Sequence, residues 1–288
     1  MRISVSSWSF QQLLAAGKIN QLDMIKRAKA LGFQAIEYID IQPMEGLGVR
    51  ETAELLREES EKCRLPIIAY TVAADFLRAA SAEAEALRLY EQVEIAKILG
   101  AGILRHDASN GFGAPENATR GFAQALPRLA EGSRLVTEYA AARGIVTTVE
   151  NHGYFCQDSL RLSALVEAVG HPNFGALVDF GNFLCADENP AQAVGNLAPY
   201  TRHVHAKDFH VKSGMADDPG EGWFRSRGGN YLRGAVIGHG EVPLRQCLGI
   251  LKRAGWDGCV SIEFEGVEDC ETALRIGLYN LKKAIQNI

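Results

Sequence analysis

The feature that most constrains the fold is a regular alternation of short apolar runs with longer amphipathic stretches. The apolar runs predict β-strands, and the stretches between them have helical spacing. The predicted strands are Ile3–Ser7, Ala35–Ile39, Ile67–Thr71, Gly102–His106, Val146–Glu150, Gly175–Asp179, His203–Lys207 and Val260–Phe264. The predicted helices are Asn20–Leu31, Glu51–Cys63, Ala82–Leu99, Ala118–Arg143, Ser159–Val169, Pro190–Leu197, Leu244–Ala254 and Glu268–Gln286.

Eight strand–helix units in a row indicate an α/β fold with a parallel sheet. Their number favours closure into a (β/α)₈ TIM barrel over an open, doubly wound sheet. No GxGxxG motif follows the first strand, which weakens a dinucleotide-binding alternative. We therefore predict a single barrel domain over residues 1–288.

Composition and charge narrow the class of protein. Hydrophobic residues make up 47% and charged residues 23% of the chain, as is typical of a globular protein in water. The net charge of −5 argues against a nucleic-acid or anionic-membrane surface. The six cysteines form no CxxC pair, and no apolar leader or membrane-spanning run is present, so we expect a cytoplasmic protein with reduced thiols.

One connection is much longer than the others. Residues 209–242, after the seventh predicted strand, contain many glycines and three arginines, Arg225, Arg227 and Arg233. Long loops in compact domains are usually functional. This loop could bind a substrate phosphate or carboxylate through Arg225 and Arg227, act as a surface flap, or contact a second subunit of a homo-oligomer.

Four of the predicted strands end in residues that can ligate a metal. These are Glu150, Asp179, His205 and Glu263. In a barrel of this kind, ligands bind where the carboxyl ends of the strands meet, so the four side chains should converge. Without a bound cation the three carboxylates would repel one another, and a divalent cation would remove that repulsion. Three carboxylates and one imidazole favour Mn²⁺ first, with Mg²⁺, Fe²⁺, Co²⁺ or Zn²⁺ as alternatives.

Other polar residues are expected at the same end of the barrel. Single acidic groups such as Asp107 and Glu265, and the imidazole of His203, are more readily explained as salt-bridge or hydrogen-bond partners. No Ser-His-Asp or Cys-His arrangement has comparable support. The candidates for substrate binding here are Trp8, Glu37, His106, His152, Asn182 and Lys207.

Four motifs, in order, carry a resemblance to a known family. They are "TTVENHG", "ALVDFGN", "HVHAKDF" and "VSIEFEG", one at each of four strand ends. Together they resemble the sugar phosphate isomerase/epimerase family of the xylose-isomerase-like TIM-barrel superfamily, and its ketose 3-epimerase branch in particular. The resemblance covers essentially the whole chain.

The resemblance implies a site and a mechanism. It assigns one divalent metal to Glu150, Asp179, His205 and Glu263, and acid–base roles to Glu150 and Glu263. It implies proton transfer on a small-molecule ketose or sugar phosphate through a metal-stabilised enediolate. The chain departs from the epimerases at Asn182, where they have a substrate-binding histidine, and at Val211, where some have an arginine.

Three other functions are compatible with the same scaffold. A lyase that dehydrates a keto-polyol of the keto-inositol type would use the same ligands. An endonuclease IV-like nuclease would need further His and Asp ligands, which the substitution at Asn182 and the acidic chain disfavour. A non-catalytic subunit would have no need of a complete ligand set.

Overall fold

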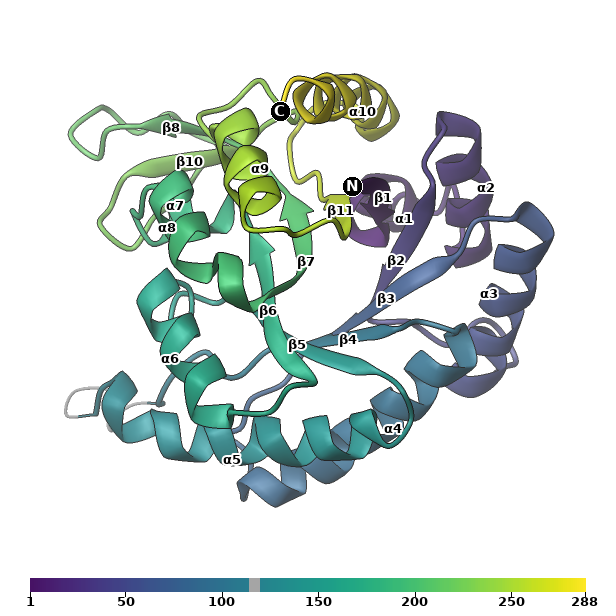
Figure 1. The fold of residues 1–288 in the computed structure, drawn as a ribbon. Coiled ribbons are helices and arrows are strands. Elements are labelled where there is room, and N and C mark those ends of the chain that lie inside the picture. Colours follow the sequence, from purple (N-terminus) through teal and green to yellow (C-terminus); the bar gives the residue numbers. More distant parts are fainter. Residues whose placement is uncertain (114–119) are drawn as a thin grey trace.

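Eight parallel strands close into a barrel, as predicted from the strand–helix alternation. The structure, a computed structural model, describes residues 1–113 and 120–288. The strands follow one another around the barrel in the order β1-β11-β7-β6-β5-β4-β3-β2 (Figure 1). They are β1 (Arg2–Ser6), β2 (Ala35–Ile39), β3 (Ile67–Val72), β4 (Ile103–His106), β5 (Val146–Glu150), β6 (Phe174–Asp179), β7 (Thr201–Ala206) and β11 (Cys259–Ile262).

The predicted helices surround this barrel (Figure 1). They are α2 (Gln21–Leu31), α3 (Val49–Cys63), α4 (Ala82–Leu99), α5 (Phe122–Ala141), α6 (Ser159–Val169), α8 (Pro190–Leu197), α9 (Leu244–Arg253) and α10 (Cys270–Gln286). The predicted start of the fourth helix, Ala118, lies outside the described residues; the corresponding helix is α5. Among the helices of the described residues, none is long and apolar enough to cross a membrane.

Local sequence signals explain where individual helices begin and end. Asn20 accepts a hydrogen bond from the Asp23 backbone N–H, and Asp23 accepts one from the Asn20 N–H, which makes a capping box at the start of α2. The same helix ends at Gly32, whose φ of 91° is the left-handed conformation that glycine adopts without strain. Such caps define helix ends through contacts within a few residues of the sequence.

A short helical segment after β1 was not predicted. Ser6 Oγ accepts a hydrogen bond from the Trp8 backbone N–H, so β1 ends and the 3-10 helix η1 (Ser7–Phe10) begins at once. The one-turn helix α1 (Gln11–Ala15) follows directly. This turn carries Trp8 to the mouth of the barrel, where its side chain is 41% exposed. The described residues also form two further short elements, α7 (Asn182–Cys185) and η3 (Ala198–Tyr200).

The long connection after β7 is an ordered excursion rather than an open loop. It forms a three-stranded antiparallel sheet in the order β8-β10-β9, which extends outward from the barrel (Figure 1). The strands are β8 (Phe209–Lys212), β9 (Phe224–Arg225) and β10 (Tyr231–Gly234). Leu232 and Phe209 are buried together with Cys185, which attaches the sheet to the α7 region.

The inside of the barrel is unusually polar. Barrel interiors are commonly filled by branched apolar side chains. Here Ser4 Oγ lies 2.5 Å from Ser261 Oγ, and His203 Nε2 lies 2.5 Å from Glu37 Oε2. All four side chains are fully buried. The apolar core instead lies largely between the strands and the helices, and it includes Val5, Ile36, Leu104, Val149 and Val260.

Asp208 holds the end of the excursion against the barrel, and its removal should destabilise the protein. Its carboxylate accepts hydrogen bonds from the backbone N–H groups of Phe209, Gly238, Gly240 and Val242, at 2.9 to 3.0 Å. Asp208→Ala leaves these N–H groups without their partner, so we expect the free energy of unfolding to fall by about 3 kcal/mol. Urea denaturation measures this.

Asp217→Ala is the matched control for that prediction. Asp217 is an exposed aspartate of the same excursion, and the change should alter the free energy of unfolding by less than about 0.5 kcal/mol. Equal unfolding midpoints for the Asp208 and Asp217 variants would show that the four hydrogen bonds do not stabilise the fold.

Candidate metal centre

The four predicted ligands converge at the carboxyl ends of the barrel strands. Glu150 ends β5, Asp179 ends β6, His205 lies near the end of β7, and Glu263 follows β11. One ligand atom from each lies within 4.8 Å of the ligand atoms of the other three. His205 Nδ1 is 3.4 Å from Glu263 Oε2, 3.5 Å from Glu150 Oε1 and 3.8 Å from Asp179 Oδ2. All four side chains are buried.

Strand register explains this convergence. In the parallel pair of β6 and β7, Asp179 is paired with His205. In the pair of β7 and β11, His205 is paired with Ser261, two residues before Glu263. Because side chains alternate between the two faces of a strand, Ser261 and Glu263 share the inner face. The barrel therefore brings together residues that are far apart in the sequence.

Asp179 is oriented by the turn that follows it. Its Oδ1 accepts hydrogen bonds from the backbone N–H groups of Gly181 (2.8 Å) and Asn182 (3.0 Å). A Cβ atom at Gly181 would lie 2.9 Å from Lys207 Cγ, so this tight turn leaves little space for a larger residue. With Oδ1 occupied, Asp179 Oδ2 is the oxygen left facing the other ligands.

Three buried atoms of this set lack hydrogen bonds within the described residues. His205 Nε2 lies 2.6 Å from Glu37 Oε1 as an ion pair, whereas Asp179 Oδ2 and His205 Nδ1 face the other ligands. Lys207 Nζ lies 3.2 Å from Asp179 Oδ2 as an ion pair. Buried polar atoms are nearly always satisfied, so these two atoms indicate a missing partner. Three carboxylates and an imidazole nitrogen, with these two atoms facing inward, fit a divalent cation.

Glu37 lies behind His205 rather than in the cavity. Its Oε1 is 2.6 Å from His205 Nε2, and its Oε2 is 2.5 Å from His203 Nε2 and accepts a hydrogen bond from Ser261 Oγ. Burial raises the pKa of Glu37, but the adjacent His205 and His203 outweigh it and lower the pKa, so the carboxylate is ionised. An anion at Nε2 leaves Nδ1 as the ring nitrogen that is available to a metal. The sequence-based prediction that Glu37 binds substrate therefore gains no support from its position.

Replacing Glu37 by glutamine should weaken metal binding about 10- to 100-fold, as is typical for partners of metal-bound histidines. A glutamine amide is uncharged, so His205 would lose the anion that lies 2.6 Å from its Nε2. Mn²⁺ affinity measured by titration calorimetry tests this. Ser4→Ala is the control, because Ser4 belongs to the same buried network but contacts Ser261 and Cys259 instead of His205. An unchanged Mn²⁺ dissociation constant in Glu37→Gln would contradict this role.

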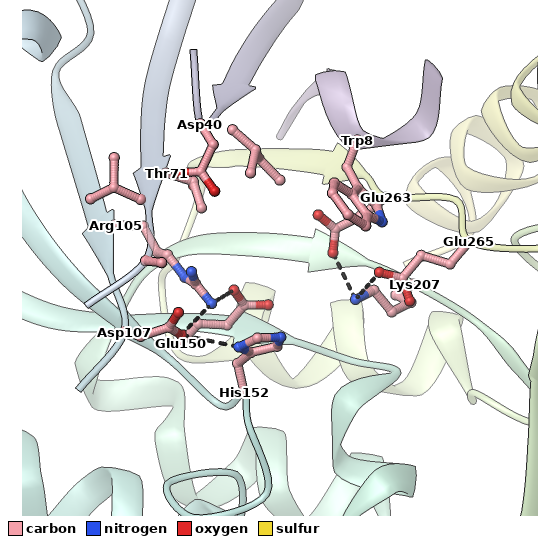
Figure 2. A pocket seen from close by; sticks show the side chains of 13 residues that line it. Trp8, Asp40, Thr71, Arg105, Asp107, Glu150, His152, Lys207, Glu263 and Glu265 are labelled. Carbon is pink, nitrogen blue, oxygen red and sulfur yellow. Dashed lines mark hydrogen bonds and ion pairs between the residues drawn. The ribbon is translucent and has the colours of Figure 1, made fainter. Parts of the chain in front are cut away.

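A cavity of about 210 Å³ opens beside the candidate metal centre, and two of the four ligands line it. Glu150 and Glu263 both line it, and Figure 2 shows Glu150 beside Arg105 and Glu263 beside Lys207 on different sides. The remaining lining residues are Trp8, Ile39, Asp40, Thr71, Val72, Ala73, Asp107, His152 and Glu265. A small molecule in this cavity would lie between the two glutamates.

Two cations balance part of the negative charge. Arg105 Nη2 lies 2.6 Å from Glu150 Oε2 and 2.9 Å from Asp107 Oδ1. Lys207 Nζ lies 2.7 Å from Glu263 Oε2 and 3.2 Å from Glu265 Oε1. Burial opposes ionisation of Glu150, but Arg105 and then His205 outweigh it and hold its pKa well below the usual range. The pKa of Glu263 is lowered in the same way by Lys207 and His205 against burial.

Some of the predicted substrate ligands lie at this cavity, and their role stays a prediction. Trp8, His152 and Lys207 line the cavity. Asn182 Nδ2 donates to Glu150 Oε1 at 3.1 Å, and Lys207 Nζ donates to Asn182 Oδ1 at 3.3 Å. Asn182, at the position where ketose 3-epimerases have a histidine, therefore links Glu150 to Lys207.

His106 lies away from the cavity. Its ring packs against Phe76 at 5.7 Å and Phe174 at 6.2 Å between centroids, and burial lowers its pKa to about 4. His106 is thus a neutral, buried side chain on the outer face of β4. A role in substrate binding remains a prediction that its position does not favour.

The arginines of the excursion have partners of their own. Arg225 donates to Gly229 O and to Tyr231 Oη, and its guanidinium stacks on the Tyr231 ring at 4.0 Å. Arg227 Nη1 pairs with Asp158 Oδ2 at 3.0 Å. Neither arginine lines the cavity. Their predicted contact with a substrate phosphate likewise remains a prediction without positional support.

The site residues chosen from the sequence did not include Arg105 or Asp40, which both line the cavity. A signal for Arg105 exists in the register of β4 and β5, where Arg105 is paired with Thr148, two residues before Glu150. Arg105 therefore shares the inner face with Glu150, and His106 takes the outer face. Asp40 had no such signal, because it follows β2 in a left-handed conformation with φ of 42°.

Comparison with known proteins agrees with the fold. Residues 25–284 match the family model described as xylose isomerase-like TIM barrel. The chain belongs to the xylose isomerase-like TIM barrel family. The resemblance seen in the four motifs is thereby confirmed at the level of this family. A search of curated protein sequences finds no match.

Solved structures share the family's fold at low sequence identity. The probable 3-DHS dehydratase AsbF of Bacillus anthracis has a TM-score of 0.75 and 19% identity, over 98% of this chain and 99% of its own. The D-psicose 3-epimerase of Clostridium cellulolyticum H10 has a TM-score of 0.74 and 14% identity, over 99% of both chains. The 3-keto-D-glucoside 4-epimerase YcjR of E. coli has a TM-score of 0.71 and 16% identity, over 98% of this chain and 99% of its own. At these identities the likeness establishes the fold.

Proposed function

We propose that this xylose isomerase-like barrel is a divalent-metal-dependent enzyme that moves a proton at the carbon beside a sugar carbonyl group. The outcome would be epimerisation or isomerisation of a keto sugar. One observation carries the proposal: Glu150 and Glu263 both belong to the ligand set and both face the same small cavity. Two structural neighbours are named as sugar epimerases, which supports a sugar as substrate.

The cation would be held by Glu150, Asp179, His205 and Glu263. Bound there, it would withdraw electrons from the substrate carbonyl and stabilise the negative charge that develops as the proton leaves. The ligand chemistry favours Mn²⁺, with Mg²⁺, Co²⁺, Fe²⁺ and Zn²⁺ as alternatives.

The two glutamates are suited to exchange protons with a substrate from different sides. Arg105 keeps Glu150 ionised, so this carboxylate can accept a proton from the carbon beside the carbonyl. Glu263 lines another side of the cavity, paired with Lys207 Nζ at 2.7 Å, and would take up a proton from solvent before it returns one to the substrate. If the proton is returned to the opposite face of the same carbon, the configuration of that carbon is inverted. If it is returned to the neighbouring carbon, the sugar is isomerised.

Dehydration of a keto-polyol is the second candidate. It needs an acid that protonates a departing hydroxyl group. His152 lies on the cavity wall with its Nδ1 3.0 Å from Asp107 Oδ1. Burial lowers the pKa of His152, but Asp107 outweighs it and raises the pKa, which favours the protonated ring. A structural neighbour named as a dehydratase agrees with this candidate.

Solvent deuterium exchange tests the proposal and separates it from dehydration. The Mn²⁺-loaded protein would be incubated in D₂O with ketoses, ketose phosphates and keto-polyols, and followed by NMR. We expect deuterium to appear at the carbon beside the carbonyl of at least one ketose, together with a new epimer or aldose. Loss of water without an epimer would instead establish the lyase. No exchange and no product with any member of the panel would refute the proposal.

A further inference from the structure

A second cavity of about 710 Å³ adjoins the candidate metal centre. It lies between η1 and α1, the start of α2, and the segment that follows β2. Trp8, Ile39 and Asp40 line both cavities, so these three residues form a shared wall. Figure 2 shows Asp40 on the side of the first cavity that is opposite His152.

The sizes of the two cavities are informative. Small-molecule sites usually have volumes of roughly 300 to 1,000 Å³. The cavity above the metal ligands, at about 210 Å³, is smaller than this range, whereas the adjoining cavity, at about 710 Å³, falls within it. A substrate larger than one small sugar would therefore have to extend past Trp8 and Asp40.

The second cavity has the chemistry of a site for an uncharged, hydroxyl-rich group. No lysine or arginine is among the described residues that line it, and its two charged groups, Asp40 and Glu45, are both acidic. Its other polar groups include the amides of Gln11 and Gln42, and its apolar groups include Leu14 and Met44. Amides and carboxylates accept hydrogen bonds from sugar hydroxyls, and an indole ring packs on the apolar face of a sugar ring.

Asp40 is held at the boundary between the cavities. Its φ of 42° is a conformation that residues other than glycine rarely adopt. Two hydrogen bonds to the Asp40 backbone hold this conformation: the Asp40 N–H donates to Thr71 O, and the Gln42 side-chain Nε2 donates to Asp40 O, both at 3.0 Å. The Asp40 carboxylate takes part in no salt bridge in the described part of the chain, since the ion pairs of Arg105 and Lys207 go to other carboxylates.

The charges of the first cavity disfavour a phosphorylated substrate. Five carboxylates line it, against one arginine, one lysine and one histidine. Each of these three cationic side chains is already paired with a carboxylate: Arg105 with Glu150, Lys207 with Glu263, and His152 with Asp107. Among the described residues that line the two cavities, a phosphate group would thus meet carboxylates and no unpaired cationic side chain, which is unfavourable.

We infer that the substrate is an unphosphorylated keto sugar joined to a second, uncharged glycosyl unit, which the Trp8–Asp40 cavity binds. This deepens the proposed function and rests on it for the reacting sugar. The keto sugar lies over the metal ligands, and the glycosyl unit passes Trp8 and Asp40 into the adjoining cavity. Leu14 and Met44 contact the glycosyl unit from two walls, and the amide of Gln11 hydrogen-bonds to its hydroxyls.

Calorimetric titration of the Mn²⁺-loaded protein tests this inference with defined probes. The probes are D-fructose, D-fructose 6-phosphate, and the disaccharides in which glucose is attached to O3, O4, O5 or O6 of D-fructose. We expect at least one disaccharide to bind at least tenfold more tightly than D-fructose, and the phosphate to bind more weakly than D-fructose. The inference is overturned if no disaccharide exceeds D-fructose, or if the phosphate binds best.

Variants that fill the second cavity test whether the additional disaccharide affinity comes from binding in this cavity. Leu14→Trp should raise the dissociation constant of the disaccharide at least tenfold and change that of D-fructose less than twofold. Met44→Trp, from another wall, should act in the same way if Leu14→Trp does not fold. Ala15→Trp is the control, because Ala15 is an exposed residue of the same short helix and does not line the cavity. Disaccharide affinity that survives both filling variants would overturn the inference.

Deuterium exchange distinguishes failure of this inference from failure of the proposed function. If exchange occurs with D-fructose and no disaccharide binds more tightly, only the glycosyl site is wrong. If a disaccharide binds tightly and no substrate exchanges a proton, the glycosyl site stands and the proton-transfer function is wrong.

Discussion

Glu150→Gln and Glu263→Gln are each expected to lower kcat by at least about a hundredfold, the lower end of what a general acid or base supplies. Glutamine keeps the shape of the side chain and one oxygen for a cation, but it cannot gain or lose a proton at the working pH. The measurement is the rate of deuterium incorporation beside the substrate carbonyl, with metal occupancy determined for each variant. Metal should be partly retained, because three of the four ligands are unchanged.

Glu265→Gln is the matched control for these two variants. Glu265 lines the same cavity and also contacts Lys207, at 3.2 Å, but it is not part of the four-residue ligand set. We expect its effect on kcat to be less than about tenfold. Wild-type exchange rates in both metal-loaded Glu150 and Glu263 variants would show that these carboxylates serve only as ligands.

Removal of the cation by a chelator is expected to abolish turnover and to lower thermal stability, both reversibly. Without a cation, the carboxylates of Glu150, Asp179 and Glu263 remain close together in a buried site. A ligand that binds only the folded state at about 100 times its dissociation constant stabilises that state by about 2.7 kcal/mol. Calorimetry with EDTA, and then with added Mn²⁺, should show a melting temperature that falls by several degrees and recovers.

Asp179→Ala serves as the control for chelation. The variant should show no Mn²⁺-dependent rise in melting temperature, because it loses the carboxylate whose Oδ2 has no hydrogen bond in the described residues. Gln192→Ala, on the exposed side of α8, should respond to Mn²⁺ as the wild type does. Protein that stays metal-free and fully active in chelator would refute metal dependence.

The sequence was sufficient to predict the barrel because the signals for it are local. Apolar runs, amphipathic spacing and glycines after helices each act within a few residues, and their repetition implies parallel strands around one axis. The four metal-ligand candidates were predictable for a related reason. Each follows an apolar run at a strand end, and in a parallel barrel all such ends lie at one mouth.

Side-chain direction at strand ends depended on the register between strands. From sequence, His106 was a candidate for the cavity and Arg105 was not. The pairing of β4 with β5 turns Arg105 inward to Glu150 and leaves His106 packed against Phe76 and Phe174. A shift of one residue exchanges the two faces of a strand, so a strand end placed by sequence alone does not decide which neighbour faces the cavity.

The tertiary structure alone decided the features built from distant segments. Glu37 lies behind His205 because β2 and β7 face each other across the barrel interior, on separate parts of its ring of strands. The second cavity exists because α1, the start of α2 and the turn at Asp40 pack beside one another. The sequence by itself determined the repeating units and the ligands at their ends, since these depend on short-range patterns. Contacts between units depend on packing and register, which no short-range pattern encodes.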